Sequence, residues 1–353
     1  MDTIYNDTII EISSILESYK KHILFEINSS MINAYWRIGE ILYNKIINNN
    51  LSLRIVSEQL KIDYGKRFSK SNIQRMIKFY TTYKTVPTLS GQLTWSHYCE
   101  LLSISSEDKR MFYEKECINS NWSVRELKRQ INTCLYERIL LSKSEINKKA
   151  IIDLAHYGNE INSPEDLIKD PYVFEFLDIP EKTLLLESDF EKALIDKLKD
   201  FILELGKGFM FVGNQQRITI DNNHYYVDLV FYNKILKSYV LIELKTGKFM
   251  PSAVGQLNMY LNYYANEIND ENDNSPIGII LCTEKDNIAV EYALGNLNSQ
   301  IFASICNQNF NFIYKTSYTL QLFHFSLQNI PYSQISYMKI SFTAYITNIF
   351  IYS

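Results

Sequence analysis

The chain has 353 residues, which is enough for two ordinary domains with a substantial core. Its cysteines are scattered, odd in number and without a CxxC pair, which excludes a disulfide framework and a zinc-finger site. The first residues lack the basic and apolar regions of a signal peptide, and no internal apolar run reaches the length of a membrane span. We therefore expect a cytoplasmic protein that does not bind a membrane.

Charge is distributed unevenly along the chain. The formal net charge is −4, but residues 1–150 contain 22 Lys or Arg against 16 Asp or Glu, a net of +6. Residues 151–304 contain 12 basic against 24 acidic residues, a net of −12. This asymmetry favours a part that contacts nucleic acid joined to an acidic part that binds metal, although random variation of the surface is the competing interpretation.

The N-terminal part is predicted to be entirely helical. Apolar residues at helical spacing indicate two helices over 8–49 and a third over about 51–64. Ser69 or Ser71 is a candidate N-cap for a helix that ends near Tyr83. Two more helices are expected at about 106–118 and 123–141, and Ser123 with Glu126 has the spacing of a capping box.

Basic residues are concentrated between residues 45 and 84, where nine Lys or Arg oppose only two acids. A short helix, a turn and a basic second helix suggest a helix-turn-helix or winged-helix element that binds nucleic acid. Lys70, Arg75 and Lys78 are its candidate contact residues. A solvated face in a plain helical bundle explains the same pattern, and this alternative stays open.

Prolines 164, 171 and 180, with acidic residues between them, mark the domain boundary. The predicted organisation is a helical domain over 1–150, a linker over 151–182 and a second domain over 183–304. In the second domain we expect one long helix to Gly206, strands at about 209–219, 224–232 and 238–245, and a helix at about 252–267. A buried run at 277–282, a short helix near 287–294 and a strand near 300–304 follow. This order predicts an α/β sandwich with a mixed sheet.

The last segment, residues 305–353, has a different composition. It contains no Asp or Glu, only Lys315 and Lys339 as basic residues, and twelve Phe or Tyr. An aromatic cap, a buried interface strand and the product of a reading-frame shift are three explanations, and we favour the last. Either of the first two would leave a large apolar surface that needs a partner.

Two of the predicted strands carry charges that a buried strand should not tolerate. Asp228 interrupts the first apolar run, and Glu243 and Lys245 lie in the second, on one face because side chains alternate along a strand. If the two strands pair as a hairpin, Asp228 can lie beside Glu243. Isolated charges are costly to bury, so the arrangement favours a divalent cation between the carboxylates, with the lysine orienting or activating a water. A structural salt bridge is the alternative explanation.

Several stretches together resemble the PD-(D/E)XK nuclease superfamily, and more closely its bacterial YhcG-type members. In the second half they are the helix segment 190–195 (FEKALI), the strand segments 211–217, 226–232 and 242–249, and 255–260 (GQLNMY). In the first half they are 34–39 (AYWRIG) and the 68–80 stretch, and 170–177 (DPYVFEFL) is similar to the linker of that family. Asp…Glu-x-Lys alone is a loose pattern, but the strand context and the other stretches make the resemblance specific.

The resemblance implies an α+β two-domain fold: an all-α N-terminal domain and a restriction-endonuclease-like α/β/α domain. It implies that Asp228 and Glu243 are metal ligands, that Lys245 positions water or stabilises charge, and that Glu191 is the helix carboxylate that completes the site. The metal expected is Mg²⁺, with Mn²⁺ as a substitute.

Further residues are candidates for contact with nucleic acid. Gln256 and Tyr260 lie one helical turn apart, and in similar nucleases this pair lines the active site or touches DNA; core packing of Tyr260 is the alternative. Gln215 and Arg217 are the candidates on the first strand, where Arg217 could bind phosphate or be an ordinary surface residue.

The function predicted is metal-dependent hydrolysis of DNA phosphodiester bonds. The alternative is a non-catalytic nucleic-acid-binding or regulatory protein that uses a nuclease-like scaffold. The histidines do not cluster with Ser or Cys, which disfavours a hydrolase triad, and the chain has no P-loop. Besides DNA, a second copy of the chain and a separate motor or defence-system partner are the partners left open.

Overall fold

The computed structural model describes residues 2–49, 52–85, 91–142, 148–169, 172–177, 186–284, 286–295 and 300–307. The chain forms two compact units, one from residues 1–131 with 152–158, and one from 132–151 with the chain from 159 onward. Apart from residues 305–307, the predicted aromatic tail lies outside the described residues. Among the described helices, none combines the length and apolar character needed to cross a bilayer.

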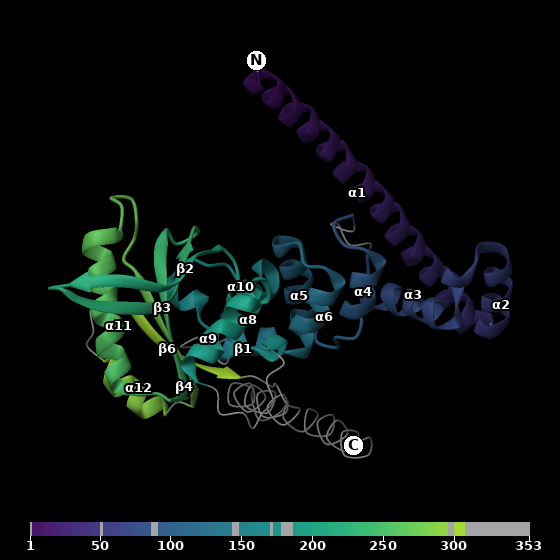
Figure 1. The fold of residues 1–353 in the computed structure, drawn as a ribbon. Coiled ribbons are helices and arrows are strands. Elements are labelled where there is room, and N and C mark those ends of the chain that lie inside the picture. The colour runs from purple at the N-terminus through teal and green to yellow at the C-terminus, as the bar shows by residue number, and fades with distance from the viewer. Residues whose placement is uncertain are drawn as a thin grey trace. The chain divides into compact units, whose positions relative to one another are not determined.

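Helices make up the first unit (Figure 1). They are α1 (Asp2–Asn49), α2 (Leu53–Tyr64), α3 (Lys70–Thr82), α4 (Trp95–Leu101), α5 (Glu107–Ser120), α6 (Val124–Asn132) and most of α8 (Lys148–Tyr157). The predicted caps are confirmed. The Ser69 side chain accepts a hydrogen bond from the N–H of Asn72, and Ser123 and Glu126 cap each other's N–H groups.

The prediction of two helices over 8–49 is wrong, because α1 is one continuous helix of 48 residues. The segment contains no proline, so nothing in the backbone forces a break. Its C-terminal half packs on α3, and a side chain at Gly39 would lie 2.1 Å from the carbonyl oxygen of Met76. Glycine therefore permits a close approach of the two helices at this point.

The other two long helices predicted are each divided in two. The region 123–141 forms α6 and α7 (Leu135–Ser142), because Cys134 adopts a left-handed conformation with φ 53°. The region 184–206 forms α9 (Glu187–Asp196) and α10 (Leu198–Leu205), separated at Lys197, where the backbone leaves the helical region at φ −111°. Side-chain periodicity continues through such breaks, which is why the apolar pattern does not reveal them.

The second unit is built on a mixed six-stranded sheet of order β1-β6-β5-β4-β3-β2. Strands β2 (Phe209–Ile220), β3 (Asn223–Asn233) and β4 (Ser238–Lys248) form an antiparallel meander. Strands β5 (Ile277–Glu284), β6 (Gln300–Asn307) and β1 (Tyr172–Val173) continue it in parallel. The predicted strands and the mixed sheet are confirmed, and β1 was not predicted from sequence.

Helices lie on both faces of this sheet (Figure 1), and an apolar core lies between the helices and the sheet on each face. On one face, α9 and α10 pack Phe190 and Phe201 against Leu229 and Phe231 of β3. On the other face, α11 (Pro251–Tyr263) packs against β4 and β5, and α12 (Asn287–Leu294) packs against α11 and β6. The result is an α/β/α sandwich in which every residue from Ile277 to Cys282 in β5 is buried, as a central parallel strand requires.

A fully buried ion pair ties α7 to the sandwich. The Arg138 guanidinium contacts the Glu204 carboxylate of α10, and both side chains are completely inaccessible to solvent. Glu204 Oε1 also accepts the backbone N–H of Val173 in β1 at 3.1 Å, and Arg138 Nε donates to the Thr133 carbonyl at 2.8 Å. These hydrogen bonds offset part of the cost of desolvating both charges.

Candidate active site

The β3–β4 hairpin brings the first two predicted ligands to the same place. Pairing runs from Asn233–Ser238 to Leu229–Ile242, so Asp228 and Glu243 are the next residues in this register. Instead of continuing the backbone ladder, the Asp228 side chain accepts the N–H of Leu244 through Oδ2 at 2.8 Å. The Asp228 carboxylate is thereby held against the middle of the Glu-Leu-Lys segment of β4.

Glu243 is almost completely buried, with 2% of its surface exposed. Its Oε1 accepts a hydrogen bond from Lys245 Nζ at 3.1 Å, while Oε2 is buried and has no hydrogen-bond partner among the described residues. Burial, followed by the nearby Asp228 carboxylate, raises the pKa of Glu243 to about 7. Burial also raises the pKa of Asp228, and the Leu244 N–H and Lys245 oppose that shift.

Lys245 is the positive charge of this cluster. Its ammonium contacts Glu243 and also Glu187 of α9, at 3.2 Å. Burial lowers the pKa of Lys245, but the two carboxylates outweigh it and the net shift is upward. The lysine therefore stays protonated, and it can supply positive charge but cannot accept a proton near neutral pH.

The Glu191 carboxylate of α9 joins the cluster through amide side chains from β2. Asn214 Nδ2 donates to one oxygen at 3.0 Å and Gln215 Nε2 to the other at 2.7 Å. The Gln215 amide also donates to Asp228 Oδ1 at 3.1 Å, so it links the two carboxylates. The Gln215 backbone is left-handed, with φ 46°, and lies just after the shift in strand register between Phe211 and Gly213.

Two members of the cluster were not predicted from sequence. Asn214 lies within the strand segment that carries the resemblance, but an amide side chain in a strand gives no signal of its own. Glu187 lies four residues before Glu191, so it occupies the same side of α9 one turn earlier. That spacing was the only available clue, and several other acids in the same region weakened it.

The carboxylates suit a hard divalent cation, although they do not form a complete cage. In the part of the chain that the structure describes, no three His, Cys, Asp or Glu side chains are grouped closely enough to hold a metal by themselves. Mg²⁺, however, commonly uses one or two protein carboxylates and retains several waters. Glu243 Oε2 has no hydrogen-bond partner among the described residues and lies near the Asp228 carboxylate. This oxygen is therefore available to coordinate such an ion, and the residues fit a divalent cation.

The remaining candidates of the second unit, Gln256, Tyr260 and Arg217, differ in their burial and in their contacts. Gln256 Nε2 donates to the Tyr260 hydroxyl at 2.7 Å on α11. Tyr260 is buried in the apolar core beneath α11. Burial is the largest cause of its raised pKa, and the negative charges of Glu243 and Asp228 raise the pKa further. Arg217 is exposed on β2, and no interaction joins it to the carboxylate cluster among the described residues.

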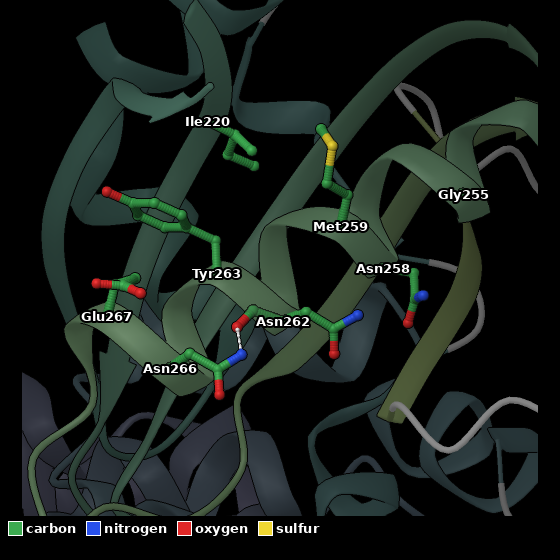
Figure 2. Close-up of a pocket in the computed structure, with 8 residues that line it drawn as sticks. All are labelled: Ile220, Gly255, Asn258, Met259, Asn262, Tyr263, Asn266 and Glu267. Carbon is green, nitrogen blue, oxygen red and sulfur yellow. Dashed lines mark hydrogen bonds between the residues drawn. The ribbon is translucent and has the colours of Figure 1, made fainter. Parts of the chain in front are cut away.

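A separate hollow of about 450 Å³ lies along α11 (Figure 2). Asn258, Asn262 and Asn266 line it at intervals of one helical turn, together with Tyr263 and with Ile220 of β2. The Asn266 side chain donates to the Asn262 carbonyl at 2.8 Å, which holds it along the helix. None of the predicted site residues lines this hollow.

In the first unit, the three basic candidates are exposed on α3. Arg75 and Lys78 line a hollow of about 750 Å³ that also includes Trp95 and Cys99 of α4. Lys70 lies at the first position of α3 and does not line this hollow. The first unit therefore carries a basic hollow, while its helix-turn-helix character remains a prediction.

Comparison with known proteins agrees with the class that this site indicates. The family profile described as "YhcG PDDEXK nuclease domain" matches residues 165–317, and the "DUF1016 N-terminal domain" matches residues 11–138. The sheet domain is therefore a nuclease domain of the PD-(D/E)XK class, with a restriction-endonuclease-like fold. Nucleases of this class generally use divalent metal ions.

A relative covers most of the chain. The Escherichia coli (strain K12) protein named "Putative nuclease YhcG" is 35% identical over an alignment of 329 residues, and the match covers 82% of this chain and 86% of the relative. The chain belongs to the YhcG family of nucleases.

Solved structures are more distant. A repair endonuclease from Pyrococcus abyssi is 15% identical over 37% of this chain, with a TM-score of 0.25. EndoMS in its apo form is 15% identical over 34% of this chain, also with a TM-score of 0.25. The match spans about half of each of those chains.

Proposed function

We propose that the protein hydrolyses DNA phosphodiester bonds in a reaction that depends on Mg²⁺, for which Mn²⁺ can substitute. The observation that carries this proposal is the buried Glu243 Oε2 near Asp228, for which the described part of the chain offers no hydrogen-bond partner. Two adjacent carboxylates in a buried position repel one another, and a cation between them would remove that cost. A bound Mg²⁺ lowers the pKa of a coordinated water and stabilises negative charge on the scissile phosphate.

The protein side chains have distinct roles in this proposal. Asp228 and Glu243 hold the cation, and the Leu244 N–H fixes the orientation of Asp228. Lys245 places a permanent positive charge next to Glu243, where it can hold a water or steady the phosphate as negative charge develops. Glu191 is the third carboxylate, and Gln215 keeps it aligned with Asp228.

Contacts with DNA are proposed in both units. In the nuclease domain, Gln256 is partly exposed whereas Tyr260 is buried, so we assign contact with DNA to Gln256. The Tyr260 hydroxyl, which accepts a hydrogen bond from the Gln256 side chain, would hold Gln256 in position. Arg217 would bind a backbone phosphate. In the first unit, Lys70, Arg75 and Lys78 would bind phosphates through charge, which supplies affinity without sequence preference.

The proposal is tested by separating metal binding from cleavage. Asp228→Asn and Glu243→Gln keep the shape of each side chain and remove its charge. We expect both variants to lose Mn²⁺ binding in calorimetry and Mg²⁺-dependent cleavage of plasmid DNA, by about 100-fold or more. Asp196→Asn, at an exposed position on α9, is the control and should behave as wild type.

Two results would contradict the proposal. The first is full cleavage by either variant, which would remove the carboxylates from the mechanism. The second is wild-type protein that binds Mn²⁺ and DNA but cleaves neither linear, nicked nor branched DNA, which would favour the non-catalytic alternative.

A further inference from the structure

The N-terminal half of α1 carries a long apolar stripe that no other described residue covers. Its large side chains lie at alternating spacings of four and three residues and are between 52% and 66% exposed: Tyr5, Ile9, Ile12, Leu16, Tyr19 and Ile23. This half of α1 extends away from the other helices of its unit (Figure 1). Alternating spacing of this kind is the seam of a coiled coil, in which each helix covers the stripe of another.

The stripe is not an extension of the face with which α1 packs in its own unit. The buried residues of α1 are Ile32, Tyr35 and Leu42, in its C-terminal half. Ile23 and Ile32 are nine residues apart, which is about 2.5 turns of an α-helix, so they lie on opposite sides. The contacts that bury Ile32 therefore cannot continue along the helix to cover Ile23.

The spacing of the stripe is self-complementary in the antiparallel direction. In an antiparallel pair related by a two-fold axis, Tyr5 meets Ile23 of the other helix and Ile9 meets Tyr19. Ile12 then meets Leu16 at the centre. All six residues find a partner in this single register, and the overlap ends before the first buried residue of α1. Isologous pairing of this kind is what two-fold symmetry demands.

Charge favours the antiparallel over the parallel arrangement. By sequence, residues 2–16 contain three acids and no Lys or Arg, whereas Lys20 and Lys21 follow shortly after. A parallel pair would set the acidic turns of both helices side by side. An antiparallel pair in this register sets Asp7 level with Lys21 of the other helix, while Glu11 is level with Glu17, and it also aligns the helix dipoles favourably.

We propose that the N-terminal half of α1 docks on a second copy of this chain as an antiparallel coiled coil centred between Ile12 and Leu16. The paired segment from Tyr5 to Ile23 is about 28 Å long at 1.5 Å per residue. The pair would cover six large apolar side chains from each helix, each more than half exposed in the single chain, and stable interfaces typically bury about 1,200 Å² or more. This inference does not depend on the nuclease activity.

The first test measures the mass of the full chain in solution by light scattering. We expect twice the chain mass of 41.5 kDa at about 10 μM. Ile12→Asp combined with Leu16→Asp should return the mass to that of one chain. Ile62→Asp, at a position on α2 that is 79% exposed, is the matched control and should remain dimeric. A monomeric wild type, or a dimer that survives the double substitution, would overturn the proposal.

The second test establishes the register without disrupting the helix. Cys99 is the one free cysteine of the described chain that is not buried, so Cys99→Ser serves as the background. We expect the double variant Tyr5→Cys with Ile23→Cys to form a disulfide-linked dimer under mild oxidation, and each single variant to remain uncrosslinked. Crosslinking by both single variants would indicate a parallel pair, and no crosslinking of the double variant would exclude the proposed contact.

Discussion

The Leu244 N–H donates to Asp228 Oδ2 at 2.8 Å, and this bond places the Asp228 carboxylate between Glu243 and Lys245 on the neighbouring strand. A side chain here replaces a rung of the β3–β4 ladder, whose regular pairing ends at Leu229–Ile242. Regular backbone pairing in the hairpin therefore ends where the charged side chains of Asp228, Glu243 and Lys245 come together. A local interruption of regular strand pairing is a common way to redirect a side chain.

Removing the positive charge of the cluster should impair chemistry more than binding. We expect Lys245→Met to lower the rate of DNA cleavage by about 100- to 1000-fold, because a charge next to the reacting phosphate is lost. Affinity for DNA, measured by fluorescence anisotropy, should change by less than about twofold. Lys234→Met, on the exposed β3–β4 loop, is the control. Cleavage at the wild-type rate by Lys245→Met would exclude the assigned role.

The link between Glu191 and Asp228 should matter without being essential. Gln215→Ala removes the amide that donates to both carboxylates. Partners of metal ligands typically contribute 10- to 100-fold to metal affinity or activity, and we expect a loss in that range for Mn²⁺ binding and for cleavage. Gln216→Ala is the control. In the described part of the chain, the Gln216 side-chain amide donates to the Asn214 carbonyl and makes no hydrogen bond to a carboxylate of the cluster. Equal effects of the two substitutions would argue against a specific link.

The raised pKa of Glu243 predicts a pH-dependent stability of the metal-free protein. The pKa is 4.5 in the unfolded chain and about 7 in the folded protein, so between these values the folded state binds more protons. The contribution of Glu243 to stability is therefore complete below pH 4.5 and is lost as the pH rises through 7. At about 1.4 kcal/mol per pKa unit, the full loss between these two pKa values is about 3.5 kcal/mol.

Urea unfolding at pH 5 and pH 8 measures this contribution. Other groups titrate in the same range, so the relevant quantity is the difference between wild type and Glu243→Gln, which cannot ionise. We expect wild type to lose stability relative to the variant as the pH rises, and Mg²⁺ to reduce that loss because a cation favours the ionised carboxylate. Parallel pH profiles for the two proteins would show that Glu243 is ionised at both pH values.

The buried Arg138–Glu204 pair predicts a large effect on stability far from the chemistry. Arg138→Met removes the guanidinium that contacts the buried Glu204 carboxylate, and removing one partner of a buried ion pair typically costs about 3–5 kcal/mol. Adding Glu204→Leu should recover much of that loss, since an apolar pair of similar volume avoids the charge. The exposed pair Arg54–Glu58 is the comparison, and breaking it should cost less than about 1 kcal/mol in the same urea titration.

The basic residues of α3 predict a change in the salt dependence of DNA binding. Replacing Lys70, Arg75 and Lys78 by alanine removes up to three phosphate contacts. The slope of log affinity against log salt concentration should fall by about 3, with similar losses for unrelated DNA sequences.

The control for this prediction neutralises three other exposed basic residues, Lys149, Lys197 and Lys199. This change alters the net charge equally and tests whether any loss of charge has the same effect. An unchanged slope in the α3 variant would support the bundle interpretation, in which the basic side chains are only solvated.

Local sequence patterns determined much of the second unit. Strand periodicity alone predicted that Glu243 and Lys245 share a face, and the apolar run 277–282 predicted a buried strand; the structure confirms both. Helix caps were equally readable, because the Ser69 and Ser123 bonds form within three residues of chain. These features depend on neighbours in sequence, which is why sequence suffices for them.

Other features depended on contacts between distant segments. The left-handed backbone of Gln215 directs its amide to both Glu191 and Asp228, which are 24 and 13 residues away in sequence. The orphaned Glu243 oxygen and its raised pKa exist only because the surrounding core excludes water. The apolar pattern of α1 showed a helix but not which face is covered, since burial is a property of the packed molecule. Periodicity encodes which residues lie on one side of an element, and only tertiary packing decides what that side meets.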